Sequence, residues 1–84
     1  MIDVETYITN LREIAKVSWD VTTLNCIRDL VEQHNRYVVA IDAHFPEYVR
    51  EEALKSAKKI LETSVALVLA IYTDNLEFLD RFKI

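Results

Sequence analysis

The chain has 84 residues, a formal net charge of −4 and a hydrophobic fraction of 51%. This length fits one domain, residues 1–84, near the lower limit for a self-sufficient core. The acidic balance argues against binding to duplex nucleic acid, which usually needs a basic face. The most apolar run, 65–72, is far shorter than the roughly 20 residues of a membrane span, so no membrane partner is expected.

The composition favours helices because the chain contains no glycine and one proline. Tight turns, hairpins and phosphate-binding loops depend on glycine for backbone angles with φ > 0. The single cysteine, Cys26, cannot form an internal disulfide, and the acidic N-terminus does not resemble a signal peptide. We therefore expect an all-α protein in a reducing, cytoplasmic environment.

The first predicted helix covers about 3–16. Val4, Tyr7, Ile8 and Leu11 recur at spacings of three and four residues, so they share one helix face. Asp3 is the predicted N-cap.

The second predicted helix covers about 18–45, with Ser18 as the candidate N-cap. Its apolar side chains fall within an arc of about 140° at 100° per residue. They are Leu24, Ile27, Leu30, Val31, His34, Tyr37, Val38, Ile41 and Phe45. Pro46 ends this helix because a residue before proline is disfavoured in the α region.

The third predicted helix covers about 47–83, and Pro46 precedes it at a favourable position. Its apolar phase continues across 73–75, since Phe78 and Phe82 project on the same side as Val49 and Ile60. One continuous helix is therefore favoured. The alternative is a break with Asp74 as a new N-cap and Glu77 as its capping-box partner.

These segments predict a long antiparallel helical hairpin plus a short N-terminal helix. At 1.5 Å per residue the third helix is about 55 Å long and the second about 40 Å. Phe78, Leu79 and Phe82 would then extend beyond the second helix, uncovered unless the first helix continues outward. Exposed apolar patches usually mark interfaces. We therefore expect these residues to support self-association into a helical bundle, most simply a homodimer.

His34 lies on the apolar face of the second helix and is expected to be a buried, neutral histidine with one hydrogen-bond partner. No second His or Cys lies three or four residues away, as a helical metal site would favour. Cys26 and His44 share one flank with Gln33 and Tyr37, but they are about 27 Å apart along the axis. We therefore expect no catalytic residue, metal or cofactor.

Arg28 and His34 bound a seven-residue run that resembles the loose Arg-x(4–6)-His pattern of HEPN-type ribonucleases. That family is helical and often dimeric, so the resemblance implies RNA cleavage as an alternative function. On a regular helix, however, the two side chains point roughly 120° apart.

Two surface features are candidates for binding. Arg50, Lys55, Lys58 and Lys59 form a basic cluster that could receive an anion or an acidic partner, although interleaved glutamates favour a self-paired surface. Tyr48 follows the Pro46 turn and is expected to pack against that turn, with a role at an interface as the alternative.

The sequence therefore predicts a small, non-enzymatic helical protein that acts by protein–protein interaction, as an adaptor, inhibitor or regulator. One alternative is an oligomer that holds an anionic or nucleotide ligand between protomers. The second alternative is the HEPN-like ribonuclease. Compact glycine-free helical proteins also occur among phage-encoded inhibitors of host defences, and composition does not establish such an origin.

Overall fold

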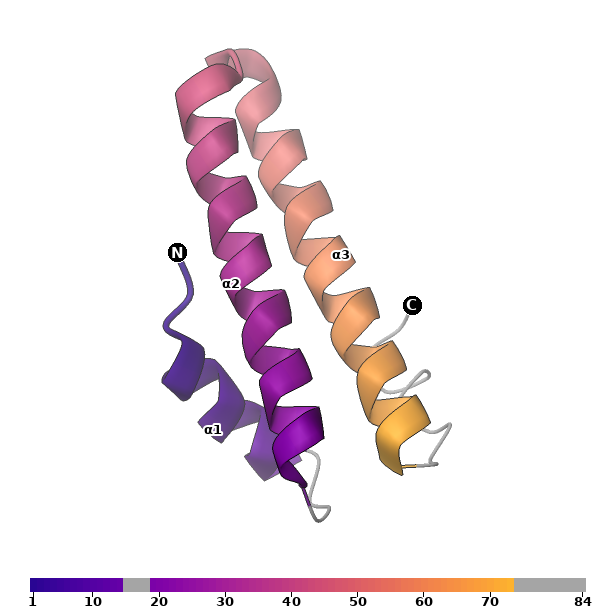
Figure 1. Cartoon of the computed structure of the whole chain (residues 1–84). Helices are drawn as coiled ribbons and strands as arrows, with labels where there is room; N and C mark the ends of the chain where they lie inside the picture. Colours follow the sequence, from indigo (N-terminus) through magenta and orange to yellow (C-terminus); the bar gives the residue numbers. More distant parts are fainter. Residues whose placement is uncertain (15–18, 74–84) are drawn as a thin grey trace.

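The computed structural model describes residues 1–14 and 19–73, and within these residues it contains three helices and no strand. They are α1 (Val4–Ile14), α2 (Val21–His44) and α3 (Glu47–Thr73). α2 and α3 form a long antiparallel hairpin, and α1 lies beside the N-terminal half of α2 (Figure 1). The all-helical prediction is confirmed. The predicted continuation of the third helix past Thr73 lies outside the described residues.

The hairpin turn is built by Phe45 and Pro46. Phe45 has an extended backbone, with φ −93° and ψ 138°, as expected before proline, and its N–H donates to the Ile41 carbonyl. The Arg50 guanidinium donates from Nη2 to the carbonyl oxygens of Asp42 and Phe45, at 3.4 Å and 3.2 Å. Arg50 therefore satisfies carbonyl groups that the end of α2 leaves without helical partners.

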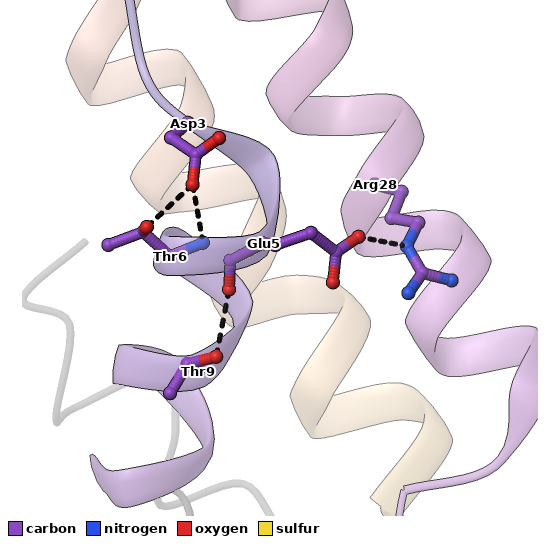
Figure 2. Close-up of polar contacts among 5 residues, drawn as sticks. All are labelled: Asp3, Glu5, Thr6, Thr9 and Arg28. Carbon is purple, nitrogen blue, oxygen red and sulfur yellow. Dashed lines mark hydrogen bonds and ion pairs between the residues drawn. The ribbon is translucent and has the colours of Figure 1, made fainter.

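The N-terminus of α2 differs from the prediction. Asp20 is the N-cap, and its Oδ1 accepts from the Thr23 N–H at 2.7 Å, so α2 begins at Val21 rather than near Ser18. Asp20 and Ser18 are both residue types that favour N-caps, and the sequence prediction chose the earlier one. For α1 the prediction was right, because Asp3 Oδ2 accepts from the Thr6 N–H at 3.0 Å (Figure 2).

The cap at Asp20 predicts a pH dependence of stability. Hydrogen bonds from Thr23, first from its backbone and then from its side chain, lower the pKa of Asp20 below its ordinary 3.8. A carboxylate with a depressed folded-state pKa stabilises the fold above its unfolded-state pKa, and this stabilisation is lost as the pH falls through the folded-state pKa. Asp20→Asn keeps the acceptor oxygen but does not ionise. Between about pH 5 and about pH 2 we expect Tm to fall more for the wild type than for Asp20→Asn. Equal changes of Tm with pH in the two proteins, measured by thermal unfolding, would contradict this role of Asp20.

α1 folds back along the hairpin and completes one side of the core. Ile8 and Leu11 of α1 are buried, and they belong to one cluster with residues of both long helices. The other buried members of this cluster are Ile27, Val31, Leu61, Val65, Leu69 and Ala70.

Two polar contacts fix the position of α1. The Asn35 side chain accepts from the Ile2 N–H through Oδ1 and donates to the Ile2 carbonyl through Nδ2, both at 2.9 Å. Three residues further along, Glu5 Oε1 lies 3.2 Å from Arg28 Nε (Figure 2). The start of the chain is therefore tied to the middle of α2, and α1 runs antiparallel to that helix.

Candidate functional site

The hairpin leaves one of its two sides uncovered by α1. Asn35 and Arg28, which hold α1, lie on one flank of α2 at 100° per residue, whereas Tyr37 lies on the other flank. We define the open face as five large apolar residues on this second side that are between 43% and 71% exposed. They are Tyr37, Phe45, Ile60, Leu67 and Ile71.

The open face contains a groove between α2 and α3. The groove has a volume of about 440 Å³ and lies between Tyr37, Phe45 and Ile60. Ile41 also lines the groove, and its remaining lining residues are small, namely Ala40, Ala53, Ser56 and Ala57. Large projecting side chains therefore border a hollow made by small ones. Helices pack by fitting ridges of one helix into such grooves of another.

The two exposed isoleucines of the open face lie where the sequence predicted an apolar face. Ile60 and Ile71 continue the helical phase of the buried Ala57, but no described residue covers them, and they are 56% and 71% exposed. The buried residues of α3 centre on another side of the helix, at Val65 and Leu69, so periodicity identified the open face of α3 and not its core. It did not reveal that α1 would cover the opposite side of the hairpin.

His34 occupies the predicted buried position. It is 8% exposed, and its Nδ1 lies 3.3 Å from the Ala57 carbonyl oxygen, so the imidazole joins α2 to α3. The nearby Arg28 is held by Glu5 on the side that faces α1. The two residues of the HEPN-like pattern therefore have different surroundings, one in the core and one in a surface ion pair.

The residues on the flank with Cys26 and His44 do not form one cluster but make separate contacts. Gln33 Nε2 donates to the Tyr37 hydroxyl at 3.1 Å, and the Cys26 thiol donates to the Tyr72 hydroxyl at 3.9 Å. The hydrogen bond between the two side chains is the main cause that raises the pKa of Tyr72. No group of three His, Cys, Asp or Glu side chains suited to a metal occurs among the residues that the structure describes.

The members of the basic cluster make different contacts. Arg50 is engaged in the hairpin turn, with its Nε 4.0 Å from Asp42 Oδ1. Lys55 Nζ lies 3.7 Å and 3.6 Å from the carboxylates of Glu51 and Glu52. Lys58 and Lys59 are both exposed, and Lys58 also lines a groove beside α1.

Tyr48 projects from the tip of the hairpin. It is 86% exposed, so the expectation that it packs against the turn is wrong. Arg50 fills the position beside the turn instead, through its bonds to the carbonyl groups of α2. The predicted self-association residues Phe78, Leu79 and Phe82 lie outside the described residues.

No protein-family model matches the chain, and comparison with curated proteins and with solved structures gives no match either. None of the helices in the described part of the chain has the length and hydropathy needed to cross a bilayer.

Proposed function

We propose that the protein is a non-enzymatic interaction protein whose open face binds a helical surface of another chain. The first partner that we propose for this face is a second copy of the protein. The observation that carries this proposal is the set of five exposed apolar side chains along the side of the hairpin opposite α1, three of which border a groove. Such patches on small proteins usually mark interfaces.

The residue spacing on α3 supports helix-on-helix binding. Ala53, Ala57, Ile60, Ser64, Leu67 and Ile71 follow one another at alternating steps of four and three residues. This alternation forms the seam of helical bundles, in which a projecting side chain enters a hole between residues of the facing helix. One face that carries both projections and hollows can pair with its own copy about a two-fold axis.

Light scattering on a charge-matched pair of variants tests this proposal. Ile60→Asp places a carboxylate in the open face, and Asn25→Asp adds the same charge at an exposed site outside it. We expect a dimer mass for the wild type and for Asn25→Asp at tens of micromolar, and a monomer mass for Ile60→Asp, because burial of the carboxylate would cost several kcal/mol. A wild-type monomer, or equal masses for the two variants, would reject the proposal.

The C-terminal residues enter the same proposal. α1 folds back along α2 and does not extend outward beyond the hairpin. The predicted difference in length between the two long helices then leaves Phe78, Leu79 and Phe82 uncovered, so we propose that they contribute to self-association. Tyr48, at the exposed tip, remains our proposed contact for a different protein partner. The pairing of Lys55 and the engagement of Arg50 in the turn give less support to an anion site made from the basic cluster.

A further inference from the structure

A second groove lies on the other side of the hairpin, between α1 and α3. It has a volume of about 280 Å³, and Ile2, Leu11, Ile14 and Leu61 supply its apolar walls. Tyr7, Asn10, Lys58 and Glu62 supply its polar groups. An adjoining hollow of about 340 Å³ shares Ile2 and Lys58 and continues along the hairpin past Val38 and Leu54. Lys58 therefore lies where two apolar hollows meet.

Lys58 differs from Lys55 and Arg50 in its contacts, and from the neighbouring Lys59 in lining both hollows. Lys55 is paired with two glutamates, and Arg50 is bonded to the carbonyl groups of the turn. Among the described residues, Lys58 has neither an ion pair within 4.0 Å nor a hydrogen bond. Its ammonium is therefore available to an anion at the edge of an apolar surface.

We propose that the groove between α1 and α3 binds a small amphipathic monoanion, with an acyl tail on the apolar walls and a carboxylate at Lys58. The groove volume is just below the roughly 300–1,000 Å³ of typical small-molecule sites, so it suits a small ligand. Apolar walls with a few polar groups are typical of such sites.

Glu62 restricts the charge of the ligand. It lines the same groove as Lys58 and lies close enough to Tyr7 to contribute, after burial, to the raised pKa of that tyrosine. Lys58 can bind one carboxylate, whereas Glu62 in the same groove disfavours a ligand with more than one negative charge. A nucleotide with several phosphate charges would be repelled by Glu62 and would find only one unpaired cation.

Titration with sodium decanoate, below its critical micelle concentration, tests the proposal by calorimetry and amide NMR. Lys58→Met removes the charge and keeps the apolar stem, and Lys55→Met is the matched control because it removes an exposed cation one turn away. We expect saturable binding to the wild type, with shifts at Leu11 and Leu61. Affinity should fall about tenfold in Lys58→Met, as for loss of a charge-assisted hydrogen bond, and should stay unchanged in Lys55→Met.

Two further ligands separate the carboxylate from the tail. Decanol should bind more weakly than decanoate and with equal affinity to the wild type and Lys58→Met, whereas ATP should not compete with decanoate. Absence of saturable decanoate binding, equal decanoate affinity in Lys58→Met, or competition by ATP would overturn the proposal. These results are independent of self-association, because Lys58 and Ile60 lie on opposite flanks of α3.

Discussion

Replacement of His34 by aspartate is expected to lower the free energy of unfolding by about 3–5 kcal/mol, because it leaves an unpaired charge in the core. The imidazole lies between α2 and α3, 8% exposed, and contacts the Ala57 carbonyl. A carboxylate at this position would lose that contact and would face a carbonyl oxygen. Since a domain of this size has only about 5–10 kcal/mol of stability, a large unfolded fraction should appear at moderate urea concentrations.

The control variant is His34→Leu, which keeps the bulk of the side chain without a charge. The Ala57 carbonyl lies inside α3, so loss of the imidazole should cost about 1 kcal/mol or less. Urea unfolding followed by far-UV circular dichroism measures both values. Similar stability for the aspartate and leucine variants would show that His34 is not in an apolar environment. If His34→Leu folded normally but abolished a measured activity, the structural role of His34 would be wrong.

The second large effect is expected at Leu69. Its side chain is fully buried in the cluster formed by the three helices, so Leu69→Ala should lower the free energy of unfolding by about 2–5 kcal/mol through lost burial and a residual cavity. Leu67, two residues earlier, belongs to the open face and is 45% exposed. Leu67→Ala should cost less than about 1 kcal/mol in the monomer.

This pair of variants separates folding from association. Urea unfolding at low protein concentration should show the large loss for Leu69→Ala alone. Light scattering at high concentration should show weaker association for Leu67→Ala. Equal losses of stability in the two variants would contradict the assignment of Leu69 to the core and Leu67 to the open face.

The helices could be predicted from the sequence because their signals are local. Apolar spacing located the three segments, and Pro46 located the turn between α2 and α3. The same periodicity placed His34 in the core. The start of α2 was less determined, since Ser18 and Asp20 are both good N-cap residues and only the structure shows which one accepts from Thr23.

The candidate site depends on contacts between distant segments, and the sequence did not predict these. The sequence analysis did not single out Asn35, yet its two hydrogen bonds to Ile2 tie the start of α1 to one side of the hairpin. The basic cluster was predicted from proximity along the chain. The contacts of its members depend on other helices, since Arg50 reaches back to the end of α2 and Lys58 lines the groove beside α1.

The central claim is that the open face pairs with a second copy of the chain. Methyl NMR spectra recorded on dilution from about 300 µM to about 1 µM, a range that encloses the dissociation constant of a few micromolar expected for a dimer at tens of micromolar, test it most directly. We predict concentration-dependent shifts for Ile60, Leu67 and Ile71, and constant shifts for Ile8 and Leu11, which are the buried residues of α1. Shifts that stay constant for the open face, or that change only for α1, would contradict the claim.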